Sequence, residues 1–156
     1  MAESAANSKE KTRAFPSFNE SLPMALMRAR DAAMLHFRPV LTAADLTEQQ
    51  WRVLRALYDE EHLDISSLAK TCHILLPSMS GILKRLEARE LIKRNINKKD
   101  QRSSVISLTS RAKALIEELA PQVEQRYLEI KEKIGIEQLD NLYRLLYELE
   151  INLLDQ

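Results

Sequence analysis

Apolar residues recur at three- and four-residue spacing along most of this chain, which is the pattern of amphipathic helices. The pattern breaks after Arg89, where the segments ELIKRNI and SVISL carry the β-branched residues of strands and flank the polar turn NKKDQRS. We therefore predict a mainly helical protein with one β-hairpin. The helical stretches are 21–41, 47–58, 64–70, 76–86, and two longer ones after Thr109 that Gly135 separates.

Several helix starts carry capping signals. Thr47 and Gln50 fit a capping box, with Leu46 and Trp51 at the positions of a hydrophobic staple. Asp64 is placed to cap the short third helix, and Thr109 the long one that follows the hairpin. The second helix is expected to bury Trp51, Leu54, Leu57 and Tyr58.

The stretch 76–108 organises the chain as a short helix followed by the hairpin. Pro77 suits a first helical position, where a missing N–H costs nothing. One face is apolar and should pack on a core: Met79, Ile82, Leu83 and Leu86. The opposite face is free to touch a partner: Ser78, Ser80, Gly81, Lys84 and Arg85.

Positive charge is concentrated on this stretch, although the formal net charge of the chain is zero. Residues 76–102 contain eight Lys or Arg (84, 85, 89, 93, 94, 98, 99, 102) against three acids (87, 90, 100). A polar-faced helix joined to a basic hairpin is typical of DNA readers. Two short helices joined tightly, the second with an exposed polar face, predict a helix-turn-helix, and the hairpin makes it a winged helix.

Composition limits the function further. With 156 residues and 45% apolar content, the chain has enough apolar side chains for one core. Cys72 is the single cysteine, which favours a reducing compartment, and the sequence shows neither a signal-peptide core nor a membrane-spanning run, so we expect a cytoplasmic protein. Only two glycines, and no catalytic or metal-binding motif, argue against an enzyme or a cofactor.

The expected organisation has four parts. Residues 1–20 are a flexible arm, 21–45 an N-terminal dimerisation helix, 46–108 the winged helix-turn-helix, and 109–156 C-terminal dimerisation helices. Residues 115–156 carry ten acids and four bases, so this end should avoid DNA. Its leucine strip suits a second copy of the chain, and a two-fold dimer presents two recognition helices roughly 34 Å apart to successive major grooves.

The order of these elements resembles the MarR family of winged-helix regulators over residues 21–154. The resemblance is carried by LTEQQWRVL, by LPSMSGILKRLEARELIKR, and by NKKDQRSSVISLT with its Asp-x-Arg signature. LPMALMRARDAAMLHFRPVL is most similar to repressors of homoprotocatechuate (hydroxyphenylacetate) degradation operons; an indoleacetate-responsive regulator would look similar. The resemblance implies a homodimer on a pseudo-palindromic operator, released by a small aromatic acid.

DNA contacts are expected from the recognition helix and the hairpin tip. Ser78 and Ser80, with Pro77 and Met79 setting the helix entry, would meet base edges and thymine methyl groups. Lys84, Arg85 and Arg94 would bind phosphates. Arg102 would enter a narrow minor groove with Asp100 orienting it, next to Lys98 and Lys99. Each of these residues has an ordinary alternative as a solvated surface group.

An effector acid needs a cation and an aromatic surface. In this fold the expected crevice lies between the first helix, the start of the second and the DNA-binding lobe. Arg52 beside Trp51 offers a fork for a carboxylate and a ring for stacking. The candidate set is Met27, Arg30, Met34, His36, Trp51 and Arg52. A core role for Trp51 and a surface ion pair of Arg52 with Glu48 are the alternatives.

Two other functions stay open. One is a redox-responsive regulator of the same type that uses Cys72, although no second cysteine is present to resolve it. The other is an architectural protein whose basic hairpin binds DNA without sequence preference.

Overall fold

The computed structural model describes residues 15, 17–97 and 100–154; of 96, 97 and 100–103 it describes the backbone only. A short 3₁₀ turn, Phe18–Glu20, precedes helices α1 (Leu22–Ala43), α2 (Glu48–Glu60), α3 (Ile65–Thr71) and α4 (Leu76–Ala88). Strands β2 (Ile92–Asn97) and β3 (Asp100–Leu108) lead to α5 (Ser110–Ile134) and α6 (Ile136–Leu154), and β1 (His62–Asp64) lies between α2 and α3. The predicted mainly helical fold with a β-hairpin is confirmed.

The chain divides into two compact units within α1, between Leu35 and His36. The first unit contains the N-terminal part of α1, whose side chains are mostly exposed within it. The second unit, from His36 on, contains the core, the helix-turn-helix and the β-hairpin.

The helix starts follow the capping chemistry predicted from the sequence. Thr47 accepts a hydrogen bond from the Gln50 amide while the Gln50 side chain accepts one from the Thr47 amide, which completes a capping box. Asp64 Oδ1 accepts from the amides of Ser66 and Ser67 at the start of α3. Thr109 accepts from the Ala112 amide at the start of α5. These hydrogen bonds satisfy donors that a helix leaves free at its N-terminus.

The core of the second unit forms where α2, α3 and α4 meet the sheet. Five leucines of this core are completely buried: Leu54, Leu57, Leu68, Leu83 and Leu86. Two expectations for α2 were wrong: Tyr58 is 39% exposed, and Trp51 is only half-buried. Val53 takes a core place instead, since it is completely buried.

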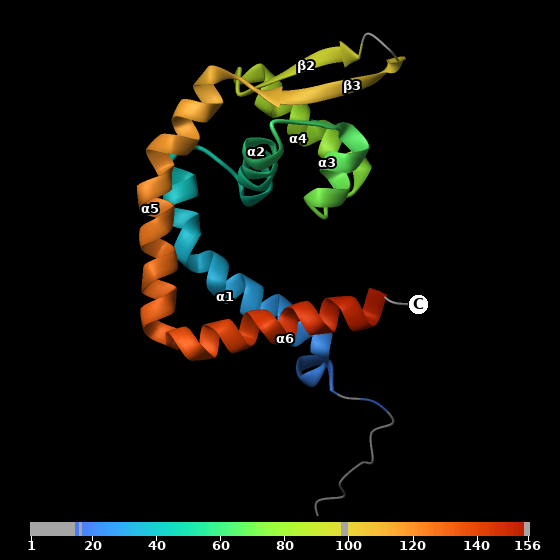
Figure 1. Cartoon of the computed structure of the whole chain (residues 1–156). Coiled ribbons are helices and arrows are strands. Elements are labelled where there is room, and N and C mark those ends of the chain that lie inside the picture. Colours follow the sequence, from blue (N-terminus) through green and yellow to red (C-terminus); the bar gives the residue numbers. More distant parts are fainter. Residues whose placement is uncertain (1–14, 16, 98–99, 155–156) are drawn as a thin grey trace, which may run out of the picture. The chain divides into compact units, whose positions relative to one another are not determined.

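The sheet has three antiparallel strands in the order β1-β3-β2. Strands β2 and β3 form a two-stranded ribbon (Figure 1). Ile92 pairs with Leu108, and the register is irregular between Ile96 and Asn97. The sequence pattern did not indicate β1, which pairs His62 with Ser107 at the other edge of β3. This third strand joins the base of the hairpin to the helix-turn-helix, because α3 begins at the residue after β1.

The two long C-terminal helices meet at Gly135, where the chain changes direction sharply (Figure 1). Gly135 has φ +88°, a backbone conformation that residues with a Cβ rarely adopt. It ends α5, as the sequence predicted.

Candidate DNA interface and effector pocket

Helix α4 has two sharply different faces. Met79, Ile82, Leu83 and Leu86 are buried, as the spacing predicted, while Ser78, Ser80, Lys84 and Arg85 are exposed. Pro77 is exposed in the first turn, where its missing N–H breaks no helical hydrogen bond. The exposed face therefore carries small hydrogen-bonding groups near the start of α4 and cations in its second half.

Met79 cannot itself read DNA, which corrects its place among the expected contacts. Its side chain is 0% exposed and belongs to the core. Its side chain packs the start of α4 against the core. Two neighbouring leucines that the sequence reasoning missed are exposed instead: Leu75 at 79% and Leu76 at 50%.

The positive charge around α4 is partly committed to the fold. Arg94 Nε lies 3.0 Å from Glu87 Oε2, and the Arg89 guanidinium contacts the α1–α2 turn. Lys84, Arg85 and Lys93 have no ion pair among the described residues, and all three are exposed. These three cations are therefore available to phosphates, fewer than the sequence count suggested.

The hairpin tip was the second expected DNA contact. Lys98 and Lys99 lie outside the described residues, and so do the side chains of Asp100 and Arg102, whose backbone belongs to β3. Their DNA contacts stay predictions.

A hollow of about 240 Å³ lies between α2 and α5. On α2, Trp51 and Arg55 line it from positions one turn apart. On α5, its walls are Ala120, Val123, Glu124 and Tyr127. It brings together two aromatic rings, one guanidinium and one carboxylate.

Two side chains that line this hollow, Tyr127 and Arg55, contact residues outside it. The Tyr127 ring packs at a tilt on Phe37, with centroids 4.8 Å apart. Arg55 Nη2 lies 3.6 Å from Asp59 Oδ1, and both side chains are largely exposed. Such an exposed pair is weak, so the Arg55 guanidinium can turn to another anion at small cost.

The predicted effector residues are placed differently from one another. Trp51 lines the hollow, but the neighbouring Arg52 points elsewhere: its Nη1 donates a 2.9 Å hydrogen bond to the carbonyl oxygen of Cys72. Glu48, the partner considered for Arg52, accepts a 2.7 Å hydrogen bond from Arg38 Nε instead. Because the Arg52 guanidinium is engaged, Arg55 is the better placed cation.

The remaining candidates lie along α1. Met27 is exposed, Met34 is half-buried, and Arg30 Nη1 lies 3.1 Å from Asp31 Oδ1; all are in the first unit. In the second unit, His36 Nδ1 lies 3.9 Å from Glu129 Oε2 on α5. His36 thus neighbours a carboxylate of the long helix.

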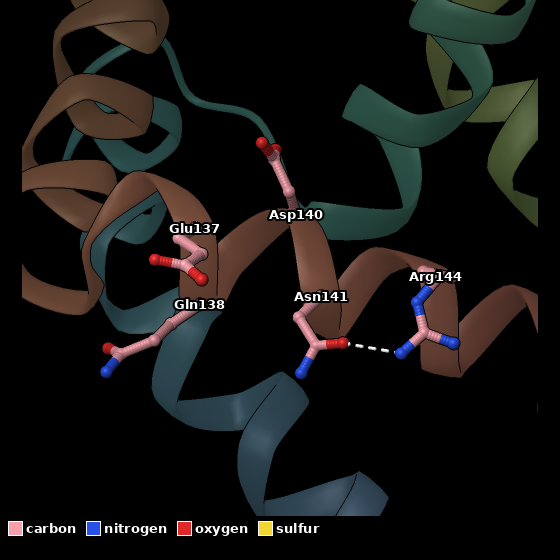
Figure 2. Close-up of a pocket in the computed structure, with 5 residues that line it drawn as sticks. All are labelled: Glu137, Gln138, Asp140, Asn141 and Arg144. Atoms are coloured by element: carbon pink, nitrogen blue, oxygen red, sulfur yellow. Dashed lines mark hydrogen bonds between the residues drawn. The ribbon is translucent and has the colours of Figure 1, made fainter.

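A larger hollow of about 630 Å³ follows α6 and is polar (Figure 2). Its described walls are Glu137, Gln138, Asp140, Asn141 and Arg144. Arg144 donates to Asn141 Oδ1 at 2.6 Å and pairs with Glu148 at 2.7 Å. These walls have no aromatic ring, and the carboxylates outnumber the one guanidinium, so the hollow suits an aromatic acid poorly.

Cys72 is completely buried at the end of α3. Burial raises the pKa of its thiol, while the Arg52 guanidinium works in the opposite direction more weakly. The neutral thiol is therefore favoured at physiological pH. Within residues 15, 17–97 and 100–154, no cluster of His, Cys, Asp and Glu is suited to a metal ion. No helix of that same part is long and apolar enough to span a bilayer.

Comparison with known proteins identifies the family to which this chain is similar. Residues 46–104 match the MarR family. The chain is 42% identical over 133 residues to the HTH-type transcriptional regulator FarR of Neisseria gonorrhoeae, covering 85% of this chain and 91% of FarR. It is 41% identical over 130 residues to the homoprotocatechuate degradative operon repressor of Escherichia coli, covering 83% of this chain and 88% of that repressor.

A solved structure extends the likeness to three dimensions. The chain in the crystal structure of NadR in complex with 4-hydroxyphenylacetate is 40% identical in sequence, with a TM-score of 0.74. The match covers 88% of this chain and 97% of the NadR chain. The fold and the extent of these matches agree with the resemblance seen in the sequence. The chain therefore belongs to the MarR family of DNA-binding transcriptional regulators.

Proposed function

We propose that this protein is a dimeric cytoplasmic repressor of an aromatic-acid catabolic operon, released from its operator by a small aromatic acid such as 4-hydroxyphenylacetate. The observation that carries the proposal is the hollow between α2 and α5, which combines Trp51, Tyr127 and Arg55. A homoprotocatechuate operon repressor at 41% identity, and a relative crystallised with 4-hydroxyphenylacetate, support this effector class.

The chemistry of the hollow fits such an acid. The rings of Trp51 and Tyr127 offer aromatic faces to a phenyl ring. The Arg55 guanidinium offers two parallel donors to a carboxylate, and the Glu124 carboxylate offers an acceptor to a phenol hydroxyl. A volume of about 240 Å³ lies below the roughly 300–1,000 Å³ of sites for drug-sized ligands, which favours a small effector.

The DNA side of the proposal keeps most of the predicted contacts. Ser78 and Ser80 meet base edges, with Pro77 setting the helix entry, and Lys84 and Arg85 meet phosphates. Arg94 meets a phosphate by exchanging its exposed ion pair with Glu87 for the DNA backbone. The exposed Leu75 and Leu76 add apolar contacts to thymine methyl groups, while the buried Met79 sets the helix entry. Lys98, Lys99, Asp100 and Arg102 act at the hairpin tip, as the Asp-x-Arg signature implies.

A second copy of the chain is the proposed partner for α5 and α6. Proteins of the MarR family are dimers. In the single chain, α6 buries none of its side chains, and its exposed apolar residues include Leu142, Leu145, Leu146, Leu153 and Leu154. So large an apolar surface is unfavourable in water and calls for a protein partner.

The effector proposal is tested by measuring how much 4-hydroxyphenylacetate releases the protein from the intergenic DNA beside its gene. We expect the wild type to be released and Arg55→Ala to bind this DNA normally but resist release. Arg55→Lys should keep part of the response. The neutral amide 4-hydroxyphenylacetamide is the ligand control, since it lacks the carboxylate that Arg55 would bind. Normal release of Arg55→Ala would place the acid elsewhere.

Two other functions are distinguished by the same DNA. An architectural protein would bind the intergenic duplex and a scrambled duplex with equal affinity. A redox regulator would lose DNA binding on peroxide treatment, and Cys72→Ser would abolish that loss.

A further inference from the structure

We infer that Arg52 and Arg89 are positioning residues for operator binding, because Arg52 ties the turn before the recognition helix α4 to α2, and Arg89 ties the C-terminal end of α4 to the turn before α2. Neither residue needs to touch DNA for this role. The inference rests on the DNA binding proposed above and concerns how the recognition helix is held.

Arg52 secures the approach to α4. It lies in the first half of α2, and its Nη1 donates a 2.9 Å hydrogen bond to the Cys72 carbonyl oxygen, in the turn that joins α3 to α4. The Cys72 thiol, in return, donates to the carbonyl oxygen of Arg52, with sulfur and oxygen 3.7 Å apart. Because Cys72 is the C-terminal cap of α3, its carbonyl has no helical donor, and a guanidinium is a strong replacement.

Arg89 secures the other end. It is the C-terminal cap of α4, and its guanidinium donates to the carbonyl oxygens of Ala44, at 3.3 Å, and of Asp45. Its Nη2 also lies 3.7 Å from the Asp45 carboxylate. Ala44 and Asp45 form the turn that enters α2, just before the Thr47 capping box.

The two ties act at opposite ends of one helix. α4 is 13 residues long, and the apolar contacts of its buried face are non-directional. Hydrogen bonds are directional, so ties at both ends fix its tilt and register. Base-edge contacts depend on such placement to a fraction of an ångström, whereas contacts with phosphates tolerate more movement.

This difference predicts a selective defect. Loss of either tie should weaken binding to specific DNA and leave non-specific binding unchanged. Loss of a residue that bound a phosphate directly would instead weaken specific and non-specific binding equally. It would also lower the salt dependence of binding by about one unit of slope.

The experiment measures affinity of the full-length protein for its intergenic operator duplex and for a scrambled duplex, at several salt concentrations. For Arg52→Ala and Arg89→Ala we expect roughly tenfold weaker operator binding, the effect of losing one hydrogen bond to a charged group, with scrambled-DNA affinity and salt slope unchanged. Arg52→Lys, which keeps one charged donor, should recover most of the operator affinity. Arg111→Ala is the charge-matched control, since among the described residues Arg111 forms only an exposed ion pair with Glu90.

Three results would overturn the inference: unchanged operator affinity in both alanine variants, equal losses on both duplexes with a lower salt slope, or no recovery in Arg52→Lys while circular dichroism shows it folded. If an alanine variant unfolds, the lysine variants at both positions decide between these outcomes. A wild type that binds both duplexes equally would instead contradict the proposed function, before any variant is compared.

Discussion

The thiol of Cys72 faces the carbonyl oxygen of Arg52, 3.7 Å away, on the buried side of the helix-turn-helix. A cysteine sensor needs an accessible thiolate. Here burial raises the thiol pKa, and the side chain is completely covered. This burial favours a packing and hydrogen-bonding role for Cys72 over a redox role.

We predict that Cys72 in the folded protein reacts very slowly with a thiol-specific reagent at neutral pH. Reaction should become fast only when the protein is unfolded in guanidinium, because both accessibility and the pKa then return to ordinary values. Labelling is followed by absorbance, with guanidinium-unfolded protein as the control. Rapid labelling of the native protein, accompanied by loss of DNA binding, would revive the redox function.

Asp64 links the pH dependence of stability to the cap of α3. Hydrogen bonds from the Ser67 hydroxyl, first of all, and from the Ser67 amide lower the pKa of this carboxyl. Because the folded-state pKa lies below the unfolded one, the stabilisation is present above the ordinary value of 3.8 and is lost as the pH falls through the folded-state pKa.

We predict that Asp64→Ala lowers the free energy of unfolding by about 1 kcal/mol at neutral pH. The difference from wild type should shrink below about pH 4, where the wild-type carboxyl gains its proton. Urea titrations at a fixed protein concentration and several pH values measure this. Asp64→Asn is the control, since an amide also caps but does not titrate. A difference that stays constant down to pH 2 would rule out this linkage.

What the sequence could predict depends on how far apart the interacting residues lie. The capping box of Thr47 and the caps of Asp64 and Thr109 join residues two or three positions apart, so their spacing alone identified them. Likewise, the spacing of the buried face of α4 needed no partner to be recognised. Strand β1 was missed because it is three residues long and exists through pairing with β3, more than 40 residues away.

The site shows the same limit. Arg52 and Arg55 are three positions apart on α2 and therefore neighbours on its surface, so helical spacing alone cannot say which of the two faces α5. The partner of Arg52 is 20 residues away and that of Arg89 is 44 to 45 away. Leu76 lies three positions before the buried Met79, so its spacing suggests burial; yet α4 begins there, and the side chain remains half exposed.

Glu90 is strained at the end of α4. Its φ is +57°, in the region that favours glycine. After it, the Leu91 amide donates back to the Leu86 carbonyl oxygen at 3.0 Å, as in a Schellman motif at a helix C-terminus. With only two glycines in the chain, described helix ends such as this one use residues with a Cβ instead.

We predict that Glu90→Gly raises the free energy of unfolding by about 1 kcal/mol, because it removes the clash of the Cβ in this conformation. Glu90→Ala is the matched control: it loses the same exposed ion pair with Arg111 but keeps the Cβ. Urea unfolding at equal protein concentration compares the variants. Equal stability of the glycine and alanine variants would show that the backbone strain at residue 90 is negligible.

Leu75 and Leu76 expose apolar surface at the start of α4, beside Ser78 on the proposed DNA face. Such surface is useful only if something apolar covers it, and the major groove offers the methyl group of thymine. The methyl can be removed without changing base pairing, by replacing thymine with uracil in the operator duplex. This makes the contact testable from the DNA side as well as from the protein side.

We predict that uracil substitution under the recognition helix weakens wild-type binding by roughly threefold to tenfold per methyl contacted, the effect of uncovering a small apolar group. The doubly substituted Leu75→Ala, Leu76→Ala protein should bind the thymine operator more weakly and discriminate little between thymine and uracil. Uracil placed outside the two half-sites is the control. If wild type and variant lose equal affinity on the uracil duplex, the leucines do not touch the methyl groups, and their exposure serves another contact.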